Sequence, residues 1–243
     1  MPKEDIKIIY EDKDILAVNK PAGLLVHLDP KKKRKDEETL VGWLIEKYSG
    51  IKEVGDDPEL RPGIVHRLDK ETSGVLVIAK NQEAFERLKS QFQKREVKKE
   101  YLALVRGVLK EPSGVIDLPI GKSKKDFRKK TSLGKMAGKV REAVTEYEVV
   151  KRFGGYTLVK VFPKTGRTHQ IRVHFKAIGH PVVCDKLYGP KKQDCLGLQR
   201  HFLHASSLEI ALPSGGRIKL EADLPDDLQK VLKSLEQEEN GTQ

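Results

Sequence analysis

A continuous apolar run, Val75 to Ala79, follows directly on nine residues rich in charged and turn-forming side chains, His66 to Gly74. An apolar run of this length, bounded by turn residues, is typical of a strand that is buried on both faces. The next segment, Gln82 to Arg95, places its large apolar residues at helical spacing. The chain is therefore predicted to pass from a polar loop into a buried strand and then into an amphipathic helix.

The polar loop carries one carboxylate, Asp69, among potential cations. Positive neighbours such as Arg67 and Lys70 favour the ionised form of an aspartate, and Thr72 and Ser73 are residues that brace tight turns. This pattern fits an active-site loop, but it also fits a solvated charged turn that leads into a strand. Local composition alone favours the solvated turn.

A second cluster of polar residues, Thr165 to Pro181, changes that balance. Two arginines, three histidines and a glutamine alternate there with apolar residues. The apolar positions after Thr168 do not settle on one period, so both a helix and a strand are compatible with the pattern. Such a density of charged and hydrogen-bonding side chains indicates a binding or catalytic segment.

Together these segments resemble the pseudouridine synthases, specifically the branch that modifies large-subunit ribosomal RNA and some transfer RNAs (the RluA family). Five blocks carry the resemblance in the family's order. They are Asn19-Lys20-Pro21-Ala22-Gly23-Leu24-Leu25-Val26-His27, His66-Arg67-Leu68-Asp69 with Thr72-Ser73-Gly74, Lys99-Glu100-Tyr101, Arg167 to His174, and Asp185-Lys186-Leu187-Tyr188-Gly189.

The resemblance implies an α+β fold, in which a mixed, largely antiparallel bent sheet with flanking helices surrounds a central RNA-binding cleft. The irregular order of predicted strands and helices also favours α+β over repeated βαβ units. We expect one catalytic domain over residues 1–243, with basic insertions at about 29–38 and 121–140. Because the sheet is predicted to begin by Ile6, no N-terminal RNA-binding module is expected.

The resemblance assigns catalytic roles to Asp69, Tyr101 and Arg172. Asp69 would act either as a nucleophile or as a base at the sugar, and the sequence does not separate these routes. Tyr101 would stack on the uracil and receive or relay the C5 proton; without the resemblance it is simply a strand aromatic. Arg172 would pair with Asp69 and keep it ionised.

Substrate-binding roles follow for a second set of residues: Arg67, Ile171, Arg167, His66 and Thr72. Arg67 would occupy the space that the flipped base leaves, although a surface arginine paired with an acid is the plainer interpretation. Ile171 would lie against the base, and taken alone it is a core residue. The histidines at 66, 169 and 174 are expected to make structural hydrogen bonds or RNA contacts, and Thr72 should brace the loop.

The implied reaction breaks the bond from uracil N1 to the ribose and joins C5 to the same carbon, so substrate and product are isomers. It needs a carboxylate and an extruded nucleotide, and we expect no cofactor, no nucleotide and no metal. The expected partner is RNA, either large-subunit ribosomal RNA, transfer RNA or both. We expect a cytoplasmic protein, because the chain has no apolar run of membrane-spanning length and no secretory signal. We also expect a monomer.

The charge balance agrees with an RNA partner. Lysine and arginine number 47 against 36 acids, and the surplus is concentrated in Lys31 to Lys35 and in Gly121 to Lys130. Such segments suit a polyanion because each neutralised phosphate releases counterions. Lysine-rich loops can also serve solubility alone. With the motifs present, RNA binding is the better interpretation, and the second segment is expected to be a loop that reaches over the RNA.

Further elements follow from periodicity and turn residues. Strands or hairpins are expected at 6–10 with 15–18, 101–108, 143–150 with 156–162, and 208–212 with 217–222, and helices at 39–48 and from Pro225 onward. The resemblance favours a helix after Thr168.

Two functions of other classes compete with an isomerase. A non-catalytic RNA-binding or ribosome assembly factor would keep the fold but would be expected to lose Asp69, Tyr101 or Arg172, and all are present. A hydrolase would need a metal or a second carboxylate to activate water. A metal site at Cys184 and Cys195 with neighbouring histidines misses the usual ligand spacings.

Overall fold

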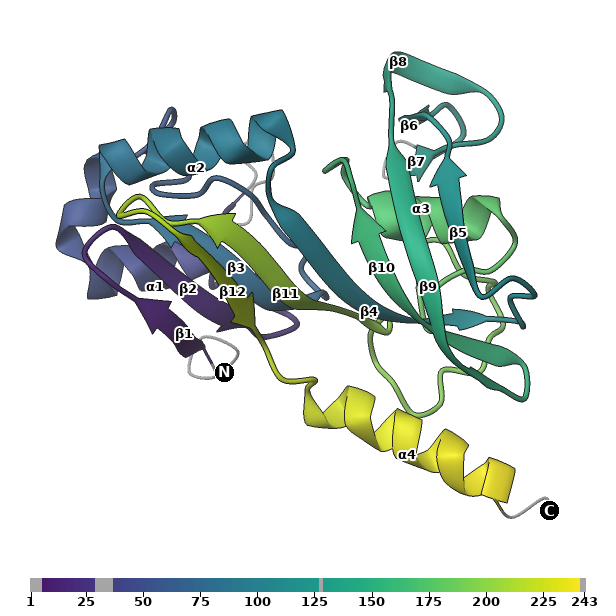
Figure 1. Cartoon of the computed structure of the whole chain (residues 1–243). Coiled ribbons are helices and arrows are strands. Elements are labelled where there is room, and N and C mark those ends of the chain that lie inside the picture. Colours follow the sequence, from purple (N-terminus) through teal and green to yellow (C-terminus); the bar gives the residue numbers. More distant parts are fainter. Residues whose placement is uncertain (1–5, 29–36, 127–128, 241–243) are drawn as a thin grey trace. The chain divides into compact units, whose positions relative to one another are not determined.

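The computed structural model describes residues 6–28, 37–126 and 129–240 (Figure 1). The chain divides into two compact units, Met1–Lys98 with Ala205–Asp223 and Lys99–His204 with Leu224–Gln243. Each contains helices and antiparallel strands, and the predicted α+β class is confirmed. Most of the basic segment expected at about 29–38 lies outside the described residues. None of the helices in the described ranges is long and apolar enough to cross a membrane.

The first unit is built on a sheet whose strands follow the order β1-β2-β3-β11, with β12 paired to β11. The strands are β1 (Lys7–Glu11), β2 (Ile15–Lys20), β3 (Ser73–Ala79), β11 (Leu203–Ala211) and β12 (Arg217–Glu221). Every residue of β3 is buried, which confirms the predicted central strand. The predicted hairpins of β1 with β2 and of β11 with β12 are also confirmed.

The helices of this unit are α1 (Leu40–Lys47) and α2 (Gln82–Lys94), with a short 3-10 helix at Ser49–Glu53. The side chain of Thr39 caps α1 by accepting a hydrogen bond from the Gly42 N–H at 3.0 Å. Asn81 caps α2 in the same way through the Ala84 N–H at 2.9 Å. The polar loop, β3 and α2 thus follow in the order that the sequence predicts.

The second unit contains the strand order β4-β10-β9-β5 and the helices α3 and α4. Its elements are β4 (Lys98–Arg106), β5 (Ser113–Asp117), β9 (Val144–Phe153), β10 (Tyr156–Pro163), α3 (Gln170–Ala177) and α4 (Asp226–Asn240). The predicted hairpin of β9 and β10 is confirmed, and so is the helix after Thr168.

The two faces of this sheet bury different helices. On one face, Val105, Val159 and Val161 pack with Ile171 and Phe175 of α3. The neighbouring strand positions point the other way: Leu104 and Leu158 form a second apolar cluster with three α4 residues, Leu228, Val231 and Leu235. Strand alternation therefore explains how one sheet holds both helices.

The basic segment at 121–140 differs from the expected loop. It contributes to a small sheet of order β7-β6-β8, made of β6 (Ile120–Ser123), β7 (Lys130–Thr131) and β8 (Met136–Arg141). Lysines hide the strand pattern in the sequence because they are poor strand formers and interrupt the apolar alternation. Backbone pairing nevertheless holds the segment, with Lys122 opposite Lys130 and Ala137.

Candidate active site

The turn that carries Asp69 is held through its backbone. The Thr72 N–H donates to the Asp69 carbonyl at 3.1 Å and closes the turn just before β3. The next carbonyl, that of Lys70, accepts from the Gly23 N–H at 2.9 Å and from Lys20 Nζ at 3.1 Å. Asp69 itself is half-buried. Its carboxylate is therefore carried on a turn whose backbone is held in place by these hydrogen bonds.

Lys20 is the unexpected member of this arrangement, because its side chain is fully buried. Its ammonium group donates to the carbonyls of Pro21 at 2.7 Å and Leu24 at 2.9 Å, in addition to that of Lys70. Three carbonyl dipoles stabilise the charge where water cannot reach it. The buried cation therefore ties the 20–24 segment to the residue that follows Asp69.

His66 and Arg67 lie on the same loop and differ in setting. His66 Nε2 accepts the Val77 N–H at 3.0 Å, and its ring stacks on Phe92 with centroids 4.6 Å apart. These contacts fix the His66 ring between β3 and α2, and the predicted role of His66 in substrate binding stays a prediction. Arg67 is exposed, and its Nη1 donates to His27 Nε2 at 3.1 Å, while His27 Nδ1 bonds the Leu28 carbonyl at 2.8 Å. A neutral His27 thus orients the Arg67 guanidinium.

Two further residues of the motif, Thr72 and Gly74, are buried. Gly74 has φ +119, and a Cβ at this position would clash with the backbone of Ala205. Only glycine allows β3 and β11 to approach so closely at this point. Thr72 is 2% exposed, which agrees with the predicted bracing of the loop.

In the second unit, the loop before α3 is anchored by Gln170. Its Oε1 accepts from Thr165 Oγ1 at 2.6 Å and from the Arg167 N–H at 3.0 Å, and its Nε2 donates to the Val144 carbonyl and to Thr145 Oγ1. Arg167 Nε also donates to the Glu142 carbonyl at 3.0 Å. Arg167, one of the predicted binding residues, is therefore fixed at the start of α3.

Arg172 lies in the first turn of α3, is only 7% exposed, and binds a partner that the sequence did not single out. Its Nε and Nη2 donate to the two carboxylate oxygens of Asp185 at 2.7 and 2.9 Å. Burial raises the pKa of Asp185, but the Arg172 hydrogen bonds and charge outweigh it and hold that pKa below its ordinary value. The expected pairing of Arg172 with Asp69 joins residues of different units and stays a prediction.

The loop that contains Asp185 also places an aromatic ring, that of Tyr188, against the Arg172 guanidinium. Tyr188 lies 5.1 Å from Arg172 Cζ, measured to the ring centroid, and Asp185 Oδ1 also accepts the Leu187 and Tyr188 N–H groups at 2.9 and 3.0 Å. The short block from Asp185 to Gly189 thus builds a complete seat for one arginine. The family resemblance contained this block, but nothing in its spacing predicted the ion pair.

Tyr101 and Ile171 belong to the same neighbourhood of the second unit. Tyr101 on β4 is half-buried and packs against the apolar cluster that contains Ile171 of α3. Ile171 is 6% exposed, as expected of a core residue. An aromatic ring at the edge of an apolar cluster offers a flat surface on which a planar base can stack.

His174, on the inner side of α3, has a structural role. Its Nε2 donates to the Leu118 carbonyl at 2.9 Å, and its Nδ1 is 2.9 Å from Thr145 Oγ1. Burial lowers the pKa of His174 below its ordinary value. These bonds agree with the expectation that His174 makes structural hydrogen bonds.

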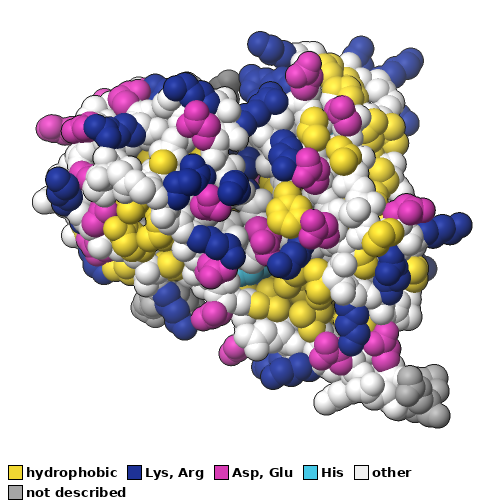
Figure 2. All heavy atoms as spheres, in the orientation of Figure 1, with side chains coloured by type: hydrophobic (Ala, Val, Ile, Leu, Met, Phe, Trp, Pro, Cys, Tyr) yellow, Lys and Arg dark blue, Asp and Glu magenta, His cyan; other side chains and the backbone are white. Residues whose placement is uncertain are grey.

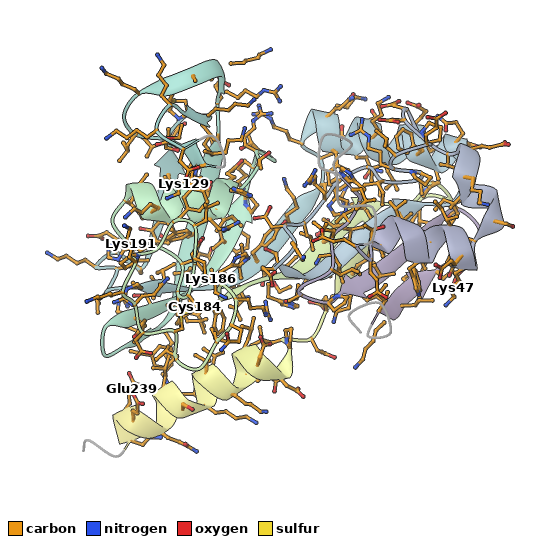
Figure 3. All side chains as sticks on the ribbon, turned by 180° about the vertical axis from the view of Figure 1, so that it is seen from behind. Lys47, Lys129, Cys184, Lys186, Lys191 and Glu239 are labelled. Atoms are coloured by element: carbon orange, nitrogen blue, oxygen red, sulfur yellow. A yellow bond between two sulfur atoms is a disulfide. The ribbon has the colours of Figure 1, made fainter. Side chains whose placement is uncertain are left out.

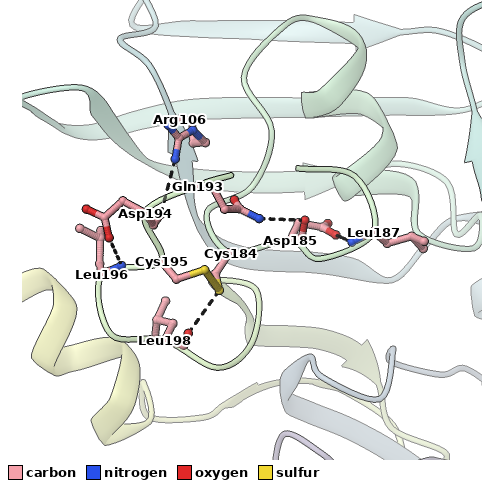
Figure 4. Close-up of a disulfide and its surroundings, with 9 residues drawn as sticks. All are labelled: Arg106, Cys184, Asp185, Leu187, Gln193, Asp194, Cys195, Leu196 and Leu198. Carbon is pink, nitrogen blue, oxygen red and sulfur yellow. Dashed lines mark hydrogen bonds between the residues drawn. A yellow bond between two sulfur atoms is a disulfide. The ribbon is translucent and has the colours of Figure 1, made fainter. Parts of the chain in front are cut away.

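Cys184 and Cys195 form a disulfide that closes the loop containing Asp185 (Figure 4). Their Cα atoms are 4.7 Å apart, and Gln193 in the same loop donates to the Asp185 carbonyl at 3.3 Å. The spacing of the two cysteines did not predict this pairing. In the described ranges, no group of three or more histidine, cysteine or acidic side chains could hold a metal ion.

Known proteins are similar to this chain in sequence and in fold. A family model described as RNA pseudouridylate synthase matches residues 14–177. The chain is 41% identical to an RNA pseudouridine synthase of Bacillus subtilis over 95% of this chain and 73% of that one. It is 40% identical to the ribosomal large subunit pseudouridine synthase D of Pseudomonas aeruginosa, over 96% and 73%.

A solved structure, human RNA pseudouridylate synthase domain containing 1, matches with a TM-score of 0.76 at 29% identity. It covers 94% of this chain and 88% of that one. The sequence similarity and the structural similarity thus extend over nearly all of this chain.

Proposed function

Because the chain belongs to the RNA pseudouridylate synthase family and isomerises uridine in RNA to pseudouridine, we propose that Asp69 is its catalytic carboxylate. The anchoring of the Asp69 turn by Lys20 and Gly23 carries this proposal. A reacting carboxylate must keep its position while the base detaches, turns and reattaches. A half-buried aspartate on a turn fixed by buried donors meets that need.

The other predicted residues take complementary roles. Arg67, exposed and oriented by His27, would fill the space left by the flipped base. Tyr101 would stack on the uracil beside Ile171 and receive or relay the C5 proton. Arg172 keeps its positive charge at all relevant pH values, and it would hold Asp69 ionised in addition to binding Asp185.

The small sheet β7-β6-β8 is the proposed contact for the RNA backbone. Figure 2 shows Lys and Arg side chains gathered around it, and Lys122, Lys124, Lys139 and Arg141 are exposed. Partial burial lowers the pKa of Lys130, and the charges of Lys122 and Arg141 lower it further. Cations close enough to affect one another in this way create the positive field that phosphates require.

Exposed lysines extend this basic surface along the same unit. Lys186 and Lys191 are exposed and lie in the loop between Cys184 and Cys195, which the disulfide closes. Figure 3 shows both of them, with Lys129, on the second unit. Phosphate contacts of this type hold an RNA without reading its sequence. Large-subunit ribosomal RNA is the substrate that we propose first, because a relative of similar sequence is named for it.

The test measures tritium release from RNA labelled at uridine C5, using ribosomal and transfer RNA pools that lack pseudouridine. Asp69→Asn should abolish release while it leaves RNA affinity nearly unchanged, and Asp56→Asn, an exposed aspartate of the same unit, is the matched control. Release by Asp69→Asn at the wild-type rate would refute the role of Asp69. Tight, salt-sensitive binding without release by the wild type would favour an RNA-binding assembly factor. Release from transfer RNA alone would replace the proposed substrate.

A further inference from the structure

Tyr188 makes two contacts that no catalytic role explains. Its hydroxyl lies 2.8 Å from His169 Nδ1 and accepts the Lys130 N–H at 2.9 Å. His169 is the residue before α3 and has φ +58, so it sits at the point where the chain turns into the helix. Lys130 belongs to β7 of the basic sheet. One hydroxyl therefore joins the start of α3 to the backbone of that sheet.

The ring of Tyr188 makes the second connection. Tyr188 is 6% exposed and packs in one apolar cluster with Ile120 of β6, Val173 of α3 and Ala143. The Tyr188 ring also lies 5.1 Å from Arg172 Cζ, measured to its centroid, and the Tyr188 N–H donates to Asp185, the partner of that arginine. The same side chain thus contacts Arg172, its partner Asp185 and two strands of the basic sheet, β6 and β7.

We propose that Tyr188 is a positioning residue that sets the basic sheet in one orientation against α3, so that an RNA held by the sheet is presented to Arg172 in one geometry. This inference rests on the proposed contact between the sheet and RNA. The hydroxyl is the specific element, because the ring could pack equally well without it. Arg167 and His174 bond the Glu142 and Leu118 carbonyls, which lie outside the strands of this sheet, whereas the Tyr188 hydroxyl bonds the backbone of β7 itself.

Tyr188→Phe tests the proposal because it keeps the ring and removes only the hydroxyl. The KM for the substrate RNA should rise about fivefold, the scale of one lost hydrogen bond, with kcat within about twofold of the wild type. The slope of log Kd against log salt should become shallower, because a sheet that is no longer oriented neutralises fewer phosphates. Tyr156→Phe, on β10 and beside the apolar cluster that contains α4, is the matched control. It should leave the KM, kcat and the salt slope unchanged.

A purely structural role would give a different result. It would lower the active fraction and therefore kcat, and it would leave the KM and the salt slope at wild-type values. An unchanged KM and salt slope in Tyr188→Phe would therefore overturn the proposal. The proposed function would stand, because the wild-type protein would still release tritium. Loss of tritium release from the wild type itself would instead refute the proposed function.

His169→Asn carries the test further, because asparagine tolerates the left-handed conformation that His169 adopts. It should raise the KM in the same direction as Tyr188→Phe does. The double variant should be no worse than Tyr188→Phe alone, since that variant already removes the bond to His169 together with the bond to Lys130. Additive effects would contradict the proposed link. If Tyr188→Phe fails to fold, the His169→Asn values decide between the two outcomes.

Discussion

The surroundings of Asp69 and of Arg172 show two ways in which this molecule fixes a charged residue. The described bonds at the Asp69 turn run through the backbone, from Lys20 and Gly23 to the Lys70 carbonyl, and the carboxylate is half-buried. Arg172 is buried and gripped directly, through two side-chain hydrogen bonds to Asp185. A group that must change partners during a reaction needs a fixed turn beneath it, whereas a group that supplies a constant charge can be locked in place.

Among the substitutions that test this comparison, Asp185→Asn should cause the largest loss of stability. It removes the charge that balances a buried guanidinium, and breaking such a pair costs about 3–5 kcal/mol in the free energy of unfolding. Urea denaturation measures the loss. Asp117→Asn, at an exposed position of the same unit, should change stability by no more than about 0.5 kcal/mol. A loss for Asp185→Asn as small as that of the control would show that Arg172 does not depend on this partner.

Lys20→Met tests the other half of the comparison. The substitution leaves the carbonyls of Pro21, Leu24 and Lys70 without their shared donor, and we expect a loss of about 2–3 kcal/mol in stability. Displacement of the Asp69 turn should also lower kcat by about 100-fold, with RNA affinity maintained. Lys13→Met, at an exposed lysine, is the control. Normal kcat in a folded Lys20→Met protein would show that the buried ammonium does not position the turn.

The smallest effect should be the pH dependence contributed by His174. Its pKa in the folded protein lies below the ordinary value of 6.5 because it is buried, so the unfolded chain binds the proton more readily. The stability from His174 is therefore present above that ordinary value and is lost as the pH falls toward the folded pKa. Thermal unfolding from pH 7 to pH 5 measures it. His174→Gln should be less stable at pH 7 but should show a shallower slope; an unchanged slope would refute this origin.

The sequence predicted the elements whose patterns are regular. Val75 to Ala79, the hairpins and the helix from Gln82 follow from apolar runs, turn residues and spacing, and the structure confirms them. The segment around Lys122 was predicted as a loop because lysines carry no strand pattern, although its backbone pairs in a sheet. Periodicity could not settle α3, and only the family resemblance favoured a helix there.

The site was less predictable than the fold. The motif positions of Asp69 and Arg172 came from the resemblance, but their partners are defined by tertiary contacts. Lysine is rarely buried, so no pattern predicted the environment of Lys20. The available signal was its place in the block from Asn19 to Gly23, directly after an apolar strand. Asp185 likewise belongs to a block that the family resemblance identified, Asp185 to Gly189. Its pairing with Arg172 depends on the fold, which places this block beside α3.

The bond between Cys184 and Cys195 has a practical consequence for every measurement described above. It makes the loop that seats Arg172 a covalent ring, and thiol reductants in a buffer can open that ring. Preparations with and without a reductant are then two chemical species, which differ only by the hydrogens on two sulfurs. Intact mass and alkylation of free thiols distinguish them. Rates and stabilities from different laboratories become comparable only when this covalent state is recorded.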